Sequence, residues 1–317
     1  MGVDLEPDNL YLRQTIADKF TKPTALDQSF VDFDSVRYRL TTPVSKTQLV
    51  LSIDIPCWHE LDQYGARAIL EREYGSLVAP AADTEDGYSV TLRLDLEQGP
   101  PAGDERTALV NAIALLKRNA LAAPFECAFA IQRDMEQNPV EEGAKDPRAQ
   151  VMSIHYRPEE AIYLLPSSDR VTVIFSTIFK EETDRILGKV FLQEFVDARR
   201  RPSCQTAPQV LYSNREPPLE IRHLPGLDTT ERAGYVTFVL FPRHFAPSTS
   251  SNTITQIQLF RDSLHYNIKC SKAYLHSRMR VRTSEFQKIL NRAKPEQPEN
   301  DADKARKTAS GRTFVRT

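Results

Sequence analysis

The sequence predicts an α+β protein of two similar domains, each a mostly antiparallel sheet with helices on one face, followed by a long C-terminal helix and a short flexible tail. Three observations lead to this class. Short segments alternate apolar and polar residues, as half-buried strands do. The order of strands, helix, strands and helix occurs twice along the chain. A run of more than 40 residues near the C-terminus contains neither glycine nor proline, which indicates one unbroken helix.

The first domain is predicted over residues 1–132, after a polar lead-in. Its strands alternate β-branched or aromatic residues with polar ones, and its helices carry apolar residues three or four positions apart. The predicted elements are strands at 29–42, 46–55 and 87–96 and helices at 57–75 and 104–129. Residues 133–149 are polar, contain two prolines and lack periodicity, so we expect a linker between the domains there.

The second domain is predicted over residues 150–250 and repeats the order of the first. Its predicted elements are strands at 149–157, 160–166, 169–179, 207–214 and 234–242 and a helix at 180–201. The spacing of apolar residues in this helix predicts a buried face made of Ile186, Leu187, Val190, Phe191 and Phe195.

The long helix is predicted over residues 251–294, with residues 295–317 as a flexible tail. Ser251 and Asn252 are good N-cap residues, and Pro295 ends the run. A helix of this length spans roughly 60 Å, so one end must overhang or lie along something else. One apolar stripe is expected to bury against the sheet of this chain: Ile257, Phe260, Leu264, Ile268, Leu275, Met279, Phe286 and Leu290.

The same helix carries a second apolar face, nearly opposite the first. Its members are Leu259, Tyr266, Cys270, Tyr274 and Val281. A surface helix needs only one apolar face, so this helix is either buried on both sides within the chain or meets another protein. The chain has no obvious element left to cover the second face, so we favour a paired helix from a partner subunit, without which the chain should dissolve poorly.

Charge is distributed unevenly along the chain. Residues 251–317 carry 14 basic and 6 acidic groups, although the whole chain has a net charge of −2. Eight basic residues and one acidic residue, Glu285, fall between 269 and 294. This asymmetry favours an anionic partner, against the alternative of an ordinary solvated helix whose last cations offset the helix dipole. Arg282 falls within the first stripe, so it must be paired or reach to solvent.

The sequence contains no pattern typical of an enzyme or a metal site. It lacks the glycine-rich phosphate loops, the HExxH motif and the GxSxG motif. His265 and His276 share one helix face, but no carboxylate-rich ligand set accompanies them, and the four cysteines lie far apart, as reduced thiols would. No apolar run is long enough for a membrane span, and aromatic residues do not interleave with the basic ones as single-stranded nucleic acid requires. We therefore expect no catalytic residue, no metal, no cofactor and no nucleic acid partner.

Several blocks of the sequence resemble one known family. They include "VDFDSVRYRL", "DRVTVIFSTIFKEETDRILGKVFLQEF", "TAPQVLYSNREPPLE", "GYVTFVLFPRH" and "IKCSKAYLHSRMRVRTSEFQKILNRAKP". These blocks resemble the subunit 2 family of the actin-related protein 2/3 complex, whose members are the larger of its two core scaffold subunits. The resemblance covers most of the chain and is weakest in the first 25 residues, at 133–150 and at "HLPGLDTTERA".

The resemblance implies a non-catalytic structural subunit of the actin-branching complex. The long helix would pack beside the matching helix of subunit 4 to form the core heterodimer, and the chain would also support the actin-related subunits, which bind the ATP. Subunits 2 and 4 would supply much of the grip on the side of the mother actin filament, from which a daughter branch is nucleated. The implied location is the cytoplasmic actin cytoskeleton, in cortical actin patches or leading-edge networks.

The resemblance and the residue pattern assign the same two surfaces. The second apolar face of the long helix is the candidate contact for subunit 4, and the basic end of that helix is the candidate contact for the acidic filament surface. The filament candidates are Lys288, Arg292 and Lys294, then Arg280 and Arg282, and finally Arg199, Arg200 and Arg201 at the end of the preceding helix. Two alternatives stay open, namely a basic-helix adaptor for RNA or anionic lipid and a stand-alone enzyme.

Overall fold

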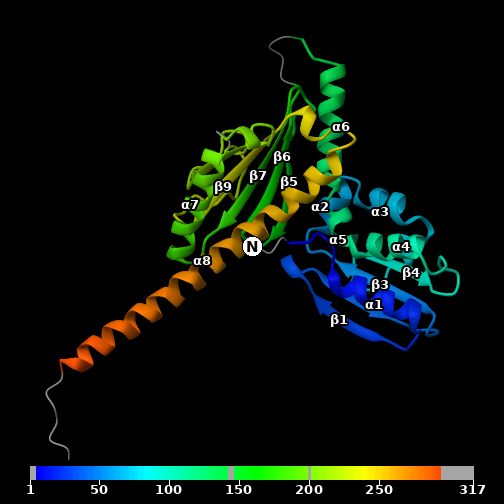
Figure 1. Cartoon of the computed structure of the whole chain (residues 1–317). Coiled ribbons are helices and arrows are strands. Elements are labelled where there is room, and N and C mark those ends of the chain that lie inside the picture. Colours follow the sequence, from blue (N-terminus) through cyan, green and yellow to red (C-terminus); the bar gives the residue numbers. More distant parts are fainter. Residues whose placement is uncertain (1–4, 142–145, 199–200, 294–317) are drawn as a thin grey trace, which may run out of the picture. The chain divides into compact units, whose positions relative to one another are not determined.

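Figure 1 shows the chain, whose computed structural model describes residues 5–141, 146–198 and 201–293. The chain forms two compact units, Met1–Ile268 and Lys269–Thr317. The first unit contains two antiparallel sheets with helices, as the sequence predicts. Helix α8 (Ser250–Arg292) contributes its first part to this unit and its remainder to the second unit.

The first lobe is built on a four-stranded antiparallel sheet in the order β1-β2-β3-β4. Its strands are β1 (Asp27–Val31), β2 (Arg37–Thr41), β3 (Gln48–Asp54) and β4 (Val90–Asp95). Its helices are α1 (Leu10–Thr21), α2 (Trp58–Gln63), α3 (Ala66–Tyr74), α4 (Asp104–Ala114) and α5 (Leu116–Ala120). Strand residues alternate, so Tyr38 and Leu40 face the helices, while Arg37 and Arg39 lie on the opposite, polar face. This lobe therefore has helices on one face, which confirms the predicted class.

The second lobe has a five-stranded antiparallel sheet in the order β5-β6-β7-β9-β8. Its strands are β5 (Met152–Arg157), β6 (Glu160–Pro166), β7 (Val171–Ile178), β8 (Gln209–Asn214) and β9 (Ala233–Leu240). Helices α6 (Ala123–Gln137), α7 (Glu182–Ala198) and the first part of α8 pack on one face. A small second cluster around Ile221 and Tyr235 covers the other face. All residues of the central strand β7 are buried, because both of its faces are covered.

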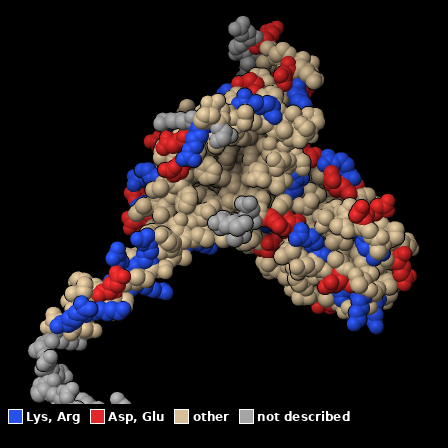
Figure 2. All heavy atoms as spheres, viewed as in Figure 1, with Lys and Arg blue, Asp and Glu red and all other residues tan. Residues whose placement is uncertain are grey.

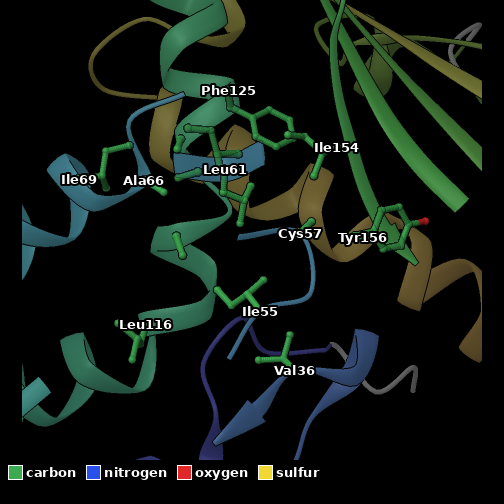
Figure 3. Close-up of a cluster of buried hydrophobic side chains, with 14 of the residues drawn as sticks. Val36, Ile55, Cys57, Leu61, Ala66, Ile69, Leu116, Phe125, Ile154 and Tyr156 are labelled. Atoms are coloured by element: carbon green, nitrogen blue, oxygen red, sulfur yellow. The ribbon is translucent and has the colours of Figure 1, made fainter. Parts of the chain in front are cut away.

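One apolar core runs through both lobes. Val36, Ile55 and Cys57 from the first lobe belong to the same cluster as Ile154 and Tyr156 of β5. Figure 3 shows these side chains converging beside α6 at the junction of the lobes. Burial of apolar surface from both sheets contributes roughly 25 cal/mol for each square ångström removed from water, so this shared core joins the lobes into one unit.

The helices of the first lobe are more broken than the sequence predicts. The predicted helix at 57–75 is two helices, since Gly65 adopts a φ of 89° between α2 and α3. The predicted helix at 104–129 is three helices, and α6 restarts near Pro124, whose ring removes an N–H donor. Helix α6 then continues to Gln137, into the segment predicted as a linker. Sequence analysis also missed α1, whose first turn is capped by the Asn9 side chain accepting from the Leu12 N–H at 3.0 Å.

The predicted buried face of α7 is wrong in three positions. Ile186 (55 %), Val190 (56 %) and Phe195 (46 %) are exposed. The buried residues are Gly188 and Leu192, with Leu187 and Phe191 half-buried and packed against the core. The reason is a close approach at Gly188, where a Cβ atom would lie 2.7 Å from a ring carbon of Phe179. A glycine at the point of contact turns the larger apolar side chains away from it.

Helix α8 buries its first apolar stripe over only half of its length. Ile257, Phe260, Leu264 and Ile268 are buried, and the ring of Phe260 packs 5.5 Å from Phe175. The prediction that this stripe continues to bury against the sheet of the chain is wrong beyond Ile268. Its later members are exposed: Leu275 (49 %), Met279 (65 %), Phe286 (61 %) and Leu290 (52 %).

Candidate partner-binding surface

The distal helix, which we define as Lys269–Arg292 of α8, combines exposed apolar residues with exposed cations. None of its side chains is buried within the described chain, and only Ser271 and Lys272 are half-buried. The exposed apolar residues include members of both predicted faces, namely Leu275, Met279, Phe286 and Leu290 of the first stripe and Tyr274 and Val281 of the second face, and also Ile289, which neither face included. Monomeric proteins rarely expose so many large apolar side chains together, which marks this helix as an interaction site.

Lysine and arginine residues accompany these apolar side chains along the distal helix, as the blue atoms in Figure 2 show. Two of the arginines contact neighbours on the same helix. Arg282 pairs with Glu285 at 3.1 Å while remaining 78 % exposed, which confirms the expectation that it is paired or reaches to solvent. Arg278 donates to the Tyr274 hydroxyl at 2.9 Å. Such exposed contacts contribute roughly 0–1 kcal/mol each, so they leave the cations available for a partner.

The predicted partner-subunit residues all lie on α8, but they differ in solvent exposure. Leu259 and Tyr266 belong to the first unit and are half-buried, whereas Cys270, Tyr274 and Val281 belong to the distal helix and are exposed. The predicted filament contacts within the described chain are all exposed: Arg201, Arg280, Arg282, Lys288 and Arg292. Arg199, Arg200 and Lys294 lie outside the described residues. These assignments stay predictions.

The structure also contains a charged cluster that sequence analysis missed. We call it the junction cluster, and its members are Asp34, Lys117, Arg157, Glu160 and Arg261. Asp34 pairs with Arg157 at 2.6 Å and with Lys117 at 3.4 Å. Glu160 pairs with Arg261 at 2.7 Å. The cluster therefore connects the first lobe, strands β5 and β6, and helix α8.

Glu160 is the most buried member of the junction cluster, with 6 % of its surface exposed. One carboxylate oxygen accepts from Arg261, and the other accepts from the Thr177 hydroxyl and the Ile178 N–H, both at 3.0 Å. A buried charge needs this degree of satisfaction, because losing its partners leaves an unpaired ion in a region of low polarity. Nearby, burial raises the pKa of Asp262, which pairs with Arg261 at 3.1 Å.

Neither of these two surfaces, as far as the structure describes them, gathers the side chains of a metal site. Within the described residues, no group of three or more histidine, cysteine, aspartate or glutamate side chains could hold a metal ion. His265 packs its ring 5.8 Å from Phe179 and lies 3.3 Å from the Thr177 hydroxyl, so it serves the packing of α8. Across the same described residues, no helix has the length and apolar content needed to cross a bilayer.

The reactivity of two cysteines reports the solvent exposure of the distal helix and of the junction between the lobes. We expect a maleimide at neutral pH to label Cys270 on the distal helix rapidly and Cys57 only after unfolding. Cys57 is 5 % exposed, and burial raises the pKa of its thiol to about 12, so almost no reactive thiolate is present at neutral pH. Mass spectrometry of labelled peptides, with and without urea, would check this. Labelling of native Cys57 as fast as Cys270 would contradict the buried junction.

A long helix with bare apolar faces, attached to a two-lobed body, defines a class of protein: a structural subunit of a larger assembly. The comparisons with known proteins agree. The family model described as "Arp2/3 complex, 34 kD subunit p34-Arc" matches residues 51–297. The chain belongs to this family, and is therefore a non-catalytic structural subunit of the actin-nucleating Arp2/3 complex.

Two curated relatives extend this likeness over nearly the whole chain. The "Actin-related protein 2/3 complex subunit 2" of Schizosaccharomyces pombe is 47 % identical over 99 % of this chain and 99 % of its own length. The protein of the same name from Dictyostelium discoideum is 37 % identical over 98 % of each chain. The family resemblance noted from the sequence is thereby confirmed.

Proposed function

We propose that the chain pairs its distal helix with the matching helix of subunit 4 to form the core heterodimer of the complex. The observation that carries this proposal is the exposure of apolar side chains on both faces of the distal helix. An isolated helix of this kind gains stability chiefly when another element covers its apolar surface. A second helix running alongside is the simplest such element. Apolar side chains that recur within seven positions on each helix then interlock along the length of the pair.

We propose further that the assembled complex binds the side of a mother actin filament, and that the basic end of the distal helix contributes to this contact. Two observations support this proposal. Cations are in excess at this end of the helix, and on the described part of the helix Glu285 is the one acidic residue after Asp262. Several aligned cations on a large interface set orientation, association rate and salt sensitivity more than affinity. The cytoplasmic actin cytoskeleton, in cortical patches or leading-edge networks, is the location that this function requires.

Filament co-sedimentation of the assembled complex tests the second proposal. We expect Lys288→Glu, Arg292→Glu and Lys294→Glu together to abolish pelleting with actin filaments and branch formation, because each cation becomes a repulsive charge against an acidic surface. Gel filtration would confirm that the complex remains whole.

A matched control carries the same change of charge elsewhere. Lys22→Glu, Lys46→Glu and Lys189→Glu alter three exposed lysines of the first unit and should leave pelleting nearly unchanged. Equal loss in both variants would mean that net charge alone matters. Unchanged pelleting in the distal variant would remove the helix end from the filament contact. Binding that needed RNA or anionic vesicles would favour the adaptor alternative.

A further inference from the structure

One stretch of the distal helix has a sequence pattern that its helical structure does not explain. From Arg278 to Thr283 the chain reads arginine, methionine, arginine, valine, arginine, threonine. Residues two positions apart do not face each other on a helix, so the three arginines lie on different sides of it. In an extended segment, residues two positions apart lie on the same side. The pattern therefore forms a row of arginines only where this segment is extended.

The helix makes little use of these three arginines. Arg282 pairs with Glu285 but is 78 % exposed, and Arg278 contacts the hydroxyl and the ring of Tyr274 on the surface. Arg280 forms no ion pair or hydrogen bond within the part of the chain that the structure describes. An excess of positive charge would account for the number of arginines, but it requires no alternation.

The threonine that follows the row is equally free of tertiary contacts. Thr283 is exposed, and its Oγ1 donates to the Met279 carbonyl oxygen of the same helix at 2.9 Å. From residue 273 to residue 293, every side chain of the described helix is exposed. Helices in proteins draw most of their stability from packing, and segments with few buried contacts open most readily. The segment around Thr283 can therefore become extended as long as no partner covers the helix.

We propose that Thr283 is a phosphorylation site for an arginine-directed serine/threonine protein kinase, which modifies it while the distal helix is uncovered. Kinases of this class bind an extended segment and recognise arginine at the third and fifth positions before the acceptor. Their carboxylates accept from both arms of each guanidinium group. Arg280 and Arg278 occupy these two positions relative to Thr283. Ser284, the next residue, has valine and methionine there, so it lacks the arginines that the kinase requires.

The phosphate comes from ATP bound to the kinase. Oγ1 of Thr283 attacks the γ-phosphorus, the bond from that phosphorus to the bridging oxygen breaks, and ADP leaves while the hydroxyl proton passes to the catalytic aspartate of the kinase. The product adds about two negative charges at neutral pH. On the helix these charges lie one turn from Arg280 and from Met279, a member of the first stripe. Phosphorylation therefore opposes both an acidic partner and an apolar one.

A kinase assay on the full chain, made by cell-free translation, tests the acceptor. The enzyme is a purified kinase that requires arginine at both positions, supplied with ATP and Mg²⁺, and mass spectrometry locates the phosphate. We expect it on Thr283 and not on Ser284. Arg278→Lys with Arg280→Lys keeps both charges but lacks the planar fork of guanidinium, so the rate at Thr283 should fall about tenfold or more. Arg292→Lys is the matched control outside the pattern and should leave that rate unchanged.

Three outcomes would overturn the assignment. They are equal phosphorylation of Thr283 and Ser284, an unchanged rate in the double lysine variant, and no phosphate on Thr283 in the full chain. A chain with Thr283→Val serves as the reference that cannot be modified at this position.

The assembled complex separates this inference from the proposed pairing with subunit 4, on which its regulatory consequence rests. If the pairing covers the distal helix, Thr283 should be modified at least about tenfold more slowly in the complex than in the full chain alone, because opening then requires loss of the partner. Chain phosphorylated before mixing should also co-purify less with tagged subunit 4 than the Thr283→Val chain treated in the same way. Equal rates in the complex and the full chain would contradict the cover that the pairing supplies, without removing Thr283 as the acceptor.

Discussion

Arg261→Met is expected to destabilise the first unit by about 3–5 kcal/mol, because it strands the Glu160 carboxylate in the interior. Arg261 is 13 % exposed and supplies the shortest contact to Glu160, at 2.7 Å. Arg157 Nε remains 3.6 Å from the same oxygen and recovers only part of the loss. Urea unfolding of the full chain, followed by the fluorescence of Trp58, the single tryptophan, would measure the change in the free energy of unfolding.

Two further variants test whether the loss of stability comes from leaving a buried charge unpaired or from the removal of any arginine. Arg282→Met removes an arginine of the same helix that is 78 % exposed and paired with Glu285, and it should change stability by no more than about 0.5 kcal/mol. Arg261→Met combined with Glu160→Gln removes the stranded charge, so it should recover most of the lost stability. If Arg261→Met unfolded at the same urea concentration as the parent, the junction cluster would not hold the lobes together.

Much of the fold is predictable because strands and helices have distinct apolar periods. The alternation at Tyr38 and Leu40 places both in the core, as observed. The period of apolar residues does not predict burial where the element packed against a helix decides which of its side chains can fit. The apolar residues of α7 were assigned to a buried face, but Gly188 is the residue that meets Phe179, and Ile186 and Val190 are exposed.

The same limit explains what was missed at the candidate sites. The excess of cations and the second apolar face of the distal helix are local patterns, so sequence analysis could find them. The junction cluster depends on pairing between distant positions, since Asp34 and Arg157 lie 123 residues apart and Glu160 and Arg261 lie 101 apart. No local pattern in the sequence reports such a pairing. The exposure of Phe33 was missed because the predicted strand at 29–42 runs through it, whereas β1 ends at Val31, β2 begins at Arg37 and a 3-10 turn lies between them.

The end of the first stripe at Ile268 changes what a partner must cover. If the stripe were buried throughout, a partner would need to meet only the second face. Because Leu275, Met279, Phe286 and Leu290 are exposed, both faces of the distal helix require a cover. This predicts an interface that surrounds the helix, or two partner elements, rather than one seam.

Met279→Asp with Phe286→Asp is therefore expected to abolish the association that we propose with subunit 4, although neither residue belongs to the second face. Each side chain is more than 60 % exposed, so the substitutions cost the isolated chain little. In an interface each would place an unpaired carboxylate among apolar groups. A loss of at least 2 kcal/mol at each position corresponds to roughly a thousandfold weaker association in total. Co-purification of the two co-expressed subunits, one of them tagged, would measure it.

Two further variants test which faces of the distal helix the partner contacts. Tyr274→Asp with Val281→Asp places the same charges on the second face and should also prevent co-purification. Gln287→Asp adds an exposed carboxylate on the flank between the faces, where a charged side chain can still reach water, and should be tolerated. If only the second-face variant failed to co-purify, subunit 4 would cover a single seam. The exposed part of the first stripe would then be free to bind another component of the complex.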